Sequence, residues 1–335
     1  MTVIDLLSQH ISDYPQDFGL SKQISQREIH ITLHTPKIET ATGRIHYKIY
    51  VGQKPTPVIF AQVAPLACNS PLADRNPYYP NCGNVVDSLT DILPKPTGEI
   101  VYTGRKIYWS KYIPWPSLQT RLNDIASYLD ISIRLRQPPW STVLNIDEQT
   151  NLSSNLLTEY VAMAQHVCSL LGELEQHQLT LKTLLFKGWD KLKFGFSHGD
   201  LWCQDILRSE TGQFCILDWE WAALARPMGI DLFHFYLTTL QYHYDISMGE
   251  ALTCLIWGYG QIETEFRHQL RRLWDELGYC TESRRVSVFT YLIYIQNRKT
   301  LQIPGTLPGI YLDIASTLSM AIVSQTYLKA LIKTD

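Results

Sequence analysis

Three aspartates near the middle of the chain are the residues best able to do chemistry. Asp200 ends a His-Gly-Asp triplet, Asp205 follows five positions later, and Asp218 comes after a second apolar run. Polar residues and a glycine at positions 209–213 predict a hairpin turn between two short strands. Such a hairpin would bring the three carboxylates to one end of a small sheet.

Grouped carboxylates need a partner. Two unit charges about 4 Å apart repel by about 4 kcal/mol at an effective dielectric near 20. Three are tolerable where a divalent cation lies among them or where one stays protonated. Oxygen ligands favour Mg²⁺, which is usually bound by one or two carboxylates together with substrate phosphates. Asp200, on a loop after a glycine, could instead face a substrate hydroxyl as a base. The alternative is that all three aspartates cap turns and helices.

The same segment resembles the aminoglycoside phosphotransferase and choline kinase family, which has a protein-kinase-like fold. Four elements recur in order with suitable gaps: His198-Gly199-Asp200-Leu201, Asp205-Ile206-Leu207, Leu217-Asp218-Trp219-Glu220 and Asp231-Leu232. The resemblance implies that Asp200 is the catalytic base, that Asp218 is the main Mg²⁺ ligand and that Asp231 is structural. Asp205 stands where the family has Asn as a second metal ligand, and a carboxylate can ligate Mg²⁺ equally well. His198 would support the loop rather than react.

The elements that must position these residues change in type along the chain. Apolar alternation predicts strands over 28–34, 44–51 and 57–64, and a hairpin of strands over 99–102 and 106–112. Helical spacing predicts helices over 2–14, 84–93, 118–129, 152–178, 232–244, 247–259, 263–277, 286–299 and 312–333. With the resemblance, this pattern predicts an α+β, protein-kinase-like fold. A small β-rich nucleotide-binding lobe would span residues 1–113. A larger helical lobe, with the catalytic hairpin and the acceptor pocket, would span residues 114–335.

The third strand departs from the family at its most important position. Relatives carry a Lys there that contacts the nucleotide phosphates, and Gln62 falls on that position in the line Pro57-Val58-Ile59-Phe60-Ala61-Gln62. Loss of one preorganised donor in an active site typically costs about 10²–10³ in rate. The alternatives are that the register is shifted by one residue, or that Lys48 or Lys54 substitutes. The partner Glu of that Lys is also missing, with Asp87 the nearest candidate. The phosphate-covering loop has only Gly43 as a weak signal.

The segment Tyr112-Ile113-Pro114-Trp115 resembles the hinge between the lobes, against whose backbone the adenine of ATP would lie. Tyr112 and Ile113 are therefore candidate nucleotide-binding residues, although Tyr112 and Trp115 could equally be core or surface aromatics. The helices after position 232 are rich in tyrosine. That suits an acceptor with apolar surface and a hydroxyl, or a cation held against aromatic faces, and equally suits a helical core with tyrosines at its edge.

Composition narrows the class of protein. The 335 residues are 45% hydrophobic, enough for one large or two modest domains with a full core. A net charge of −3 argues against a nucleic-acid partner. Seven cysteines without a C-x-x-C spacing indicate reduced thiols of a cytoplasmic protein. With neither a signal-peptide pattern nor an apolar run of about 18 residues, we expect no membrane association.

These observations predict a small-molecule phosphotransferase that moves the γ-phosphoryl of ATP, or of GTP, to an acceptor hydroxyl with Mg²⁺. The alternative is a catalytically degenerate kinase-like module that binds a metabolite or a partner protein. Gln62, Asp205, Trp115 and the absent helix Glu motivate that alternative. The sequence leaves the acceptor and the oligomeric state open.

Overall fold

The computed structural model describes residues 1–21, 23–34, 45–64, 76–78, 80, 83–95, 97–118, 125–144, 154–165, 183, 185–302 and 329–332. The chain divides into two compact units. The first comprises Met1–Ser117 and Asp205–Trp221, and the second comprises Leu118–Gln204 and Ala222–Asp335.

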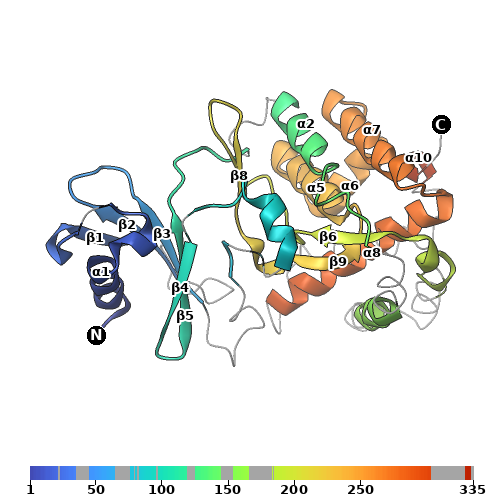
Figure 1. Cartoon of the computed structure of the whole chain (residues 1–335). Coiled ribbons are helices and arrows are strands. Elements are labelled where there is room, and N and C mark those ends of the chain that lie inside the picture. Colours follow the sequence, from blue (N-terminus) through green and yellow to red (C-terminus); the bar gives the residue numbers. More distant parts are fainter. Residues whose placement is uncertain are drawn as a thin grey trace. The chain divides into compact units, whose positions relative to one another are not determined.

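The first unit is built on one antiparallel sheet with the strand order β1-β2-β3-β5-β4 (Figure 1). Its strands are β1 (Ile29–Leu33), β2 (Ile45–Val51), β3 (Ile59–Val63), β4 (Thr97–Tyr102) and β5 (Arg105–Lys111). The five predicted strands are therefore confirmed. Thr103 and Gly104 join β4 to β5 with positive φ angles at both residues, as a tight two-residue hairpin turn requires.

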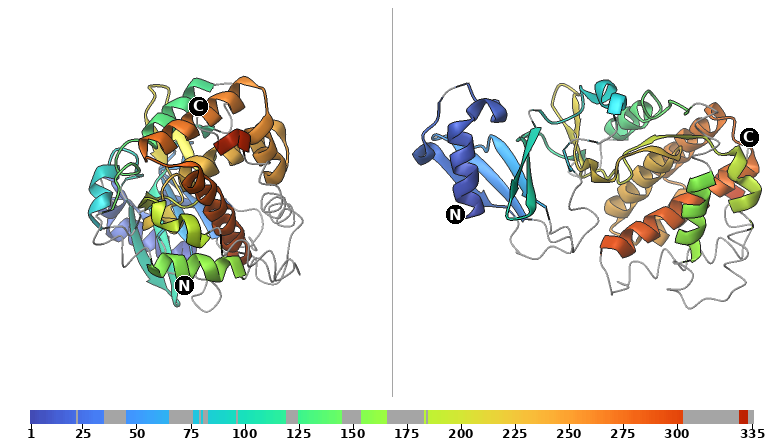
Figure 2. Two further views of the ribbon diagram at one scale, coloured as in Figure 1. Left: turned by 90° about the vertical axis from the view of Figure 1, so that its right-hand side faces the viewer. Right: turned by 60° about the horizontal axis from the view of Figure 1, so that its bottom comes forward.

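Helix α1 (Val3–Asp13) covers one face of this sheet (Figures 1 and 2). Thr2 caps it, and the Asp5 side chain accepts the Thr2 amide in return, which satisfies two otherwise orphaned amides. Leu7 and Ile11, one turn apart, are buried in the core cluster of the sheet. The other helical turns that the structure describes in this unit are the 3-10 helices η1 (Pro15–Phe18), η2 (Gln26–Glu28), η4 (Gly83–Leu89) and η7 (Trp219–Trp221).

The hairpin formed by β7 (Ile206–Arg208) and β8 (Phe214–Ile216) belongs to the first unit. Three backbone hydrogen bonds attach it: Arg208 N to Pro116 O (3.1 Å), Ile216 N to Ile92 O (2.8 Å) and Trp219 N to Pro77 O (2.8 Å). This grouping differs from our expectation that the hairpin belongs to a helical lobe of residues 114–335. The reason is that backbone pairing, which sequence order does not reveal, ties the hairpin to segments far away in the chain.

The second unit is mainly helical. Within the described residues its helices are α2 (Ile125–Arg134), helical stretches over 154–165 and 185–188, η6 (Trp189–Lys191), α5 (Ile230–Tyr244), α6 (Met248–Trp257), α7 (Gln261–Glu276), α8 (Thr281–Gln302) and α10 (Lys329–Ile332). Residues 230–240 of α5 are all buried, so this helix has a core position, with Asp231, His234, Thr238 and Thr239 as its buried polar residues. Residues 166–178 of the predicted helix over 152–178, and residues 312–328 of the predicted helix over 312–333, lie outside the described residues.

Two short strands, β6 (Phe194–Ser197) and β9 (Ala223–Pro227), pair antiparallel among helices α5, α7 and α8 (Figure 1). Gly195 lies against the backbone of residue 142. A Cβ atom at this position would come within 2.6 Å of the Thr142 carbonyl oxygen. The strand pair ends at Ser197, so it delivers the chain directly to the His-Gly-Asp triplet.

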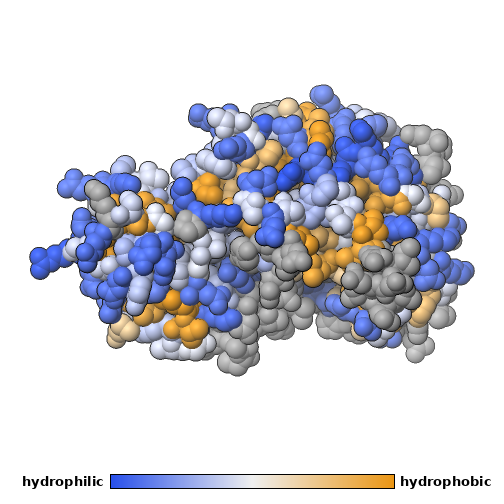
Figure 3. Space-filling model, viewed as in Figure 1, coloured by the Kyte–Doolittle hydropathy of each residue, from blue (hydrophilic) through white to orange (hydrophobic). Residues whose placement is uncertain are grey.

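The surface mixes side chains of both kinds. Hydrophilic and hydrophobic residues are interspersed on the face shown in Figure 3. Over the part of the chain that the structure describes, no helix is both long and apolar enough to cross a membrane.

Candidate active site

Asp231 anchors the loop that carries the His-Gly-Asp triplet. Its carboxylate accepts hydrogen bonds from the backbone amides of His198 (2.7 Å) and Gly199 (2.8 Å). It also accepts from the Ser197 hydroxyl (3.0 Å) and the Trp140 indole (3.1 Å). A carboxylate with four donors is fully compensated for its burial. These contacts give Asp231 a structural role, which is the role that the resemblance implies.

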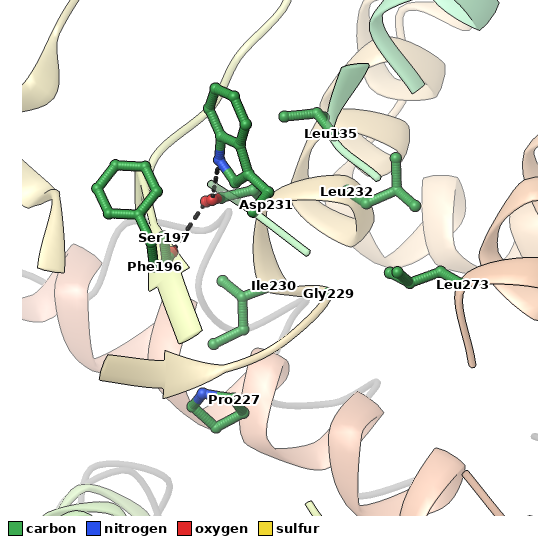
Figure 4. A pocket seen from close by; sticks show the side chains of 10 residues that line it. Leu135, Phe196, Ser197, Pro227, Gly229, Ile230, Asp231, Leu232 and Leu273 are labelled. Carbon is green, nitrogen blue, oxygen red and sulfur yellow. Dashed lines mark hydrogen bonds between the residues drawn. The ribbon is translucent and has the colours of Figure 1, made fainter. Parts of the chain in front are cut away.

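A cavity of about 10 Å³ lies beside this anchor. Figure 4 shows Asp231 and Ser197 on its wall, with Leu135, Ile230 and Leu273 on other sides. The volume is about that of one water-sized probe, far below the 300–1,000 Å³ that ligand pockets typically enclose. The cavity is therefore part of the support of the loop and not a substrate pocket.

Asp200 follows the anchored amides, and the residue is only 7% exposed. Three donors meet the same carboxylate oxygen, Oδ1. They are Trp202 Nε1 at 2.5 Å, His234 Nε2 at 3.0 Å and Arg298 Nη1 in a short ion pair. His234 and Arg298 are each 1% exposed. The residue predicted as the catalytic base is therefore a buried carboxylate with a cation beside it.

Arg298 also shapes the backbone of the triplet. Its Nη1 donates to the Gly199 carbonyl at 3.1 Å, and the Tyr294 hydroxyl donates to the same oxygen at 3.0 Å. Gly199 has a φ of 83°, a left-handed conformation that favours glycine. Burial lowers the pKa of Arg298, but the Asp200 carboxylate together with Tyr294 and Tyr291 outweighs that effect, and the pKa is raised above its ordinary value. The guanidinium therefore stays charged.

Asp205 and Asp218, the predicted metal ligands, stand at neighbouring ends of the two hairpin strands. The Leu217 amide donates to the Asp205 carbonyl at 2.9 Å, so the two aspartates flank one backbone pairing in the first unit. Asp218 has a φ of 64°, an uncommon conformation for a residue other than glycine. Both side chains are half-buried. Their carboxylate oxygens are suitable donors for Mg²⁺.

No group of three or more His, Cys, Asp or Glu side chains within the described ranges is arranged to hold a metal ion. One or two carboxylates are enough for Mg²⁺ when substrate phosphates complete its coordination, so the hairpin pair fits the ion. Asp200 belongs to the second unit, and its convergence with the hairpin pair stays a prediction.

Gln62 occupies β3, opposite His46 of β2 and Tyr108 of β5. It is 4% exposed. Ile59, Ala61 and Val63 belong to the core cluster that includes α1. Since alternate residues of a strand point to opposite faces, Gln62 lies on the sheet face away from α1. The register of β3 therefore places Gln62 on the face opposite α1, together with Tyr108 and Phe60 of a smaller core cluster.

Lys48, considered above as a substitute for the missing strand lysine, lies opposite Phe60 on this same face. Its ammonium is 5.9 Å from the centre of the Tyr112 ring. The Tyr112 amide donates to the Val58 carbonyl, four residues before Gln62 and about 13 Å away along an extended strand. Lys48 therefore approaches the hinge-like segment and not Gln62.

The other candidates for the nucleotide pocket are Tyr112, Ile113, Asp87 and Gly43. Tyr112 and Ile113 leave β5 in an irregular, half-buried segment, as a hinge would. Asp87 is exposed on η4, which is a 3-10 helix where we expected a regular one. Gly43 and the loop around it lie outside the described residues.

Sequence reasoning missed three residues that contact Asp200: Trp202, His234 and Arg298. A signal existed in the spacing. Asp231 and His234 are three apart on α5, and Tyr291, Tyr294 and Arg298 are three and seven apart on α8, so each set shares one helix face. The spacing does not reveal that both faces contact the loop at 198–200, because Gly199 and Arg298 are 99 positions apart in the sequence.

The arrangement of elements is that of a protein-kinase-like fold, with a five-stranded sheet in one unit and a helical second unit. Solved structures agree. A Plasmodium vivax ethanolamine kinase matches with a TM-score of 0.55 and 11% identity, over 98% of this chain and 91% of its own. The choline kinase LicA from Streptococcus pneumoniae matches with a TM-score of 0.55 and 12% identity, over 95% and 98%.

An aminoglycoside phosphotransferase, a thermostable mutant of APH(4)-Ia, matches with a TM-score of 0.50 and 12% identity, over 94% of this chain and 99% of that one. No family model matches the chain, and no curated protein sequence matches it. The chain therefore has the fold shared by choline kinases and aminoglycoside phosphotransferases. The predicted fold class is confirmed.

Proposed function

We propose that this chain is a small-molecule kinase that transfers the γ-phosphoryl group of ATP or GTP to a hydroxyl of a small acceptor. The observation that carries the proposal is the buried, fixed carboxylate of Asp200 on the anchored loop of a kinase-like fold. Phosphoryl transfer depends on positioning and on charge stabilisation more than on covalent chemistry. Asp200 would orient the acceptor hydroxyl and accept its proton as the phosphorus–oxygen bond forms.

Asp205 and Asp218 would hold Mg²⁺, which supplies charge neutralisation on the β- and γ-phosphates when it is bound. Their adjacent positions across the Leu217–Asp205 hydrogen bond support this role. The backbone of Tyr112 and Ile113 would meet the adenine, and Gln62 would donate a hydrogen bond where relatives use a lysine.

The surroundings of Asp200 favour an acceptor with an apolar or cationic part. Trp202 is half-buried, and its ring centre lies 5.8 Å from that of Tyr242 in an edge-to-face contact. Aromatic faces attract amines and quaternary ammonium groups. The neighbours with a matching fold are named as kinases of ethanolamine and of choline. We therefore infer that amino alcohols are the first acceptors to examine.

The test combines nucleotide binding with transfer. Mg-ATP should raise the melting temperature of the wild type. Labelled ATP should phosphorylate one member of a panel of amino alcohols, sugars and aminoglycosides. Asp200→Asn should retain the melting shift and lose transfer by a factor of about 10³ or more, whereas Asp218→Ala should lose the magnesium-dependent part of the shift. Transfer that is unchanged in Asp200→Asn would overturn the proposal.

A second candidate function is a kinase-like module that binds a ligand without catalysis. Gln62 in place of the strand lysine and the exposed Asp87 favour it. This alternative predicts no melting shift with Mg-ATP and no phosphorylated product from any acceptor. A shift by a non-nucleotide metabolite that Asp200→Asn leaves unchanged would support it.

A further inference from the structure

We propose that His234 and Arg298 are positioning residues for Asp200, and that Tyr291 sets the orientation of His234. The inference rests on the proposed function for its kinetic consequences, while its geometry concerns the second unit alone. Asp200, His234, Tyr291 and Arg298 form one buried set that links the loop to helices α5 and α8.

The imidazole of His234 bridges two groups. Its Nε2 is 3.0 Å from Asp200 Oδ1, and its Nδ1 is 2.8 Å from the Tyr291 hydroxyl oxygen. A carboxylate oxygen only accepts, so Nε2 carries the proton. Burial raises the pKa of Tyr291 above its ordinary value, so its hydroxyl keeps its proton and is a hydrogen-bond partner for Nδ1, as donor to a neutral ring or acceptor from a charged one. The tyrosine thereby fixes which edge of the imidazole meets Asp200.

Arg298 supplies the charge. A buried carboxylate is costly without a cationic or hydrogen-bonding partner, and the ion pair with Asp200 provides one at 1% exposure of the arginine. The same guanidinium nitrogen holds the Gly199 carbonyl. Arg298 therefore fixes both the side chain of Asp200 and the peptide that precedes it.

The three donors come from different parts of the unit. Trp202 belongs to the loop, His234 to α5 and Arg298 to α8. Because all three bonds end on Oδ1, they restrict rotation of the carboxylate about its χ angles. Misplacement of a reacting group by about 1 Å can cost about 10²-fold in rate, so this restriction has a measurable consequence.

Two substitutions at His234 separate positioning from packing. The amide nitrogen of Gln reaches the place of Nε2, whereas that of Asn reaches only the place of Nδ1. His234→Gln keeps the donor to Asp200 and should retain kcat within about 5-fold. His234→Asn keeps a partner for Tyr291 but loses that donor, and should lower kcat by about 10²-fold with the KM for ATP unchanged. If His234 only links α5 to α8 through Tyr291, the kcat of His234→Asn should instead exceed that of His234→Gln. His243→Asn, on the same helix, is the matched control.

Arg298→Met removes the cation and should lower kcat by more than about 10²-fold, and Arg298→Lys should recover part of that loss. Arg285→Met, on the same helix, should leave kcat unchanged. Melting temperatures of all variants show which of them remain folded. Only folded variants enter the kinetic comparison, and the two His234 variants decide the question where Arg298→Met fails to fold.

A second readout needs no catalysis. The indole N–H of Trp202 donates to the same oxygen of Asp200, and its ¹H–¹⁵N resonance can be assigned by its loss in Trp202→Phe. His234→Gln and His234→Asn both lose the imidazole ring, so a difference between their indole resonances reports the lost hydrogen bond. We expect such a difference. Identical indole resonances in the two His234 variants would overturn the positioning role even if no acceptor is ever found. If the wild-type protein transfers phosphoryl to none of the acceptors, the proposed function is overturned instead.

Discussion

The backbone amide of His198 donates to the carboxylate of Asp231 across 2.7 Å. This bond joins the end of strand β6 to the first turn of helix α5, two elements separated by more than thirty positions. Three further donors share that carboxylate. The loop that carries Asp200 is therefore fixed by Asp231, independently of the contacts that Asp200 itself makes.

We predict that Asp231→Asn destabilises the second unit. The asparagine amide would face N–H donors at a place where a carboxylate oxygen accepts them, so a buried donor is left unpaired. Removing one partner from such a buried charged network costs about 3 kcal/mol. Urea denaturation followed by circular dichroism measures the loss. Asp190→Asn is the control, because Asp190 is exposed on η6, and its effect should stay within about 0.5 kcal/mol. Equal stability of the two variants would contradict the anchoring role.

The sequence predicted the sheet well because its signals are local. Alternation in residues 45–51 and 59–63 shows strands directly, and the Thr103–Gly104 turn marks its hairpin. Strand β9 was missed, because Ala223–Pro227 holds alanines, an arginine and a proline in place of β-branched residues. It is a strand because it pairs with β6. Pairing partners of this kind are tertiary facts and leave little trace in composition.

The candidate site was predicted in part for the same reason. Asp200, Asp205 and Asp218 stand in a recognisable local pattern, and Asp231 completes it. His234 and Arg298 each lie among other buried polar residues of their helices, and such a residue has many possible partners. Their contacts with Asp200 are set by the fold, which brings α5 and α8 to the loop.

Gln62 allows the nucleotide-binding face to be tested directly. Gln62→Lys restores the lysine of the resembled family at a buried position of β3. Without ligand, a buried ammonium is penalised, so the melting temperature should fall. With Mg-ATP the phosphates would compensate that charge, and the nucleotide-dependent rise in melting temperature should exceed the wild-type rise.

Gln62→Met is the control for this prediction, since it keeps the length of the side chain and removes the donor. Its nucleotide-dependent rise should be smaller than that of the wild type. If the rise is the same in the Lys, Met and wild-type proteins, the nucleotide does not contact this position.

Two cysteines of the second unit should react in a defined order as the pH rises. Hydrogen bonding from Ser283 lowers the pKa of Cys280, whereas burial, with the nearby Glu263 and Glu250, raises the pKa of Cys254. The thiolate is the nucleophile, so a lower pKa moves the onset of reaction to lower pH. Alkylation by iodoacetamide, followed by peptide mass spectrometry, should reach half its maximal rate at lower pH for Cys280 than for Cys254.

Ser283→Ala removes the hydroxyl that donates to Cys280 Sγ at 3.5 Å. The midpoint for Cys280 should then move to higher pH, while that for Cys254 stays where it was. Coincident midpoints in the wild type would show that the hydrogen bond does not stabilise the thiolate.

Trp202 combines two roles that substitution can separate. Its indole N–H donates to Asp200 at 2.5 Å, and its ring contacts Tyr242 and His234 edge-to-face. Trp202→Phe keeps an aromatic ring and loses the donor. Loss of one hydrogen bond to a charged group, worth about 1.5 kcal/mol, should lower kcat by about 10-fold with a small change in the KM for the acceptor. Trp202→Leu should also raise that KM, because it removes the aromatic face offered to a cationic acceptor. Trp257→Phe, at an exposed tryptophan of α6, should change neither quantity. A normal kcat in Trp202→Phe would show that two donors are enough to fix Asp200.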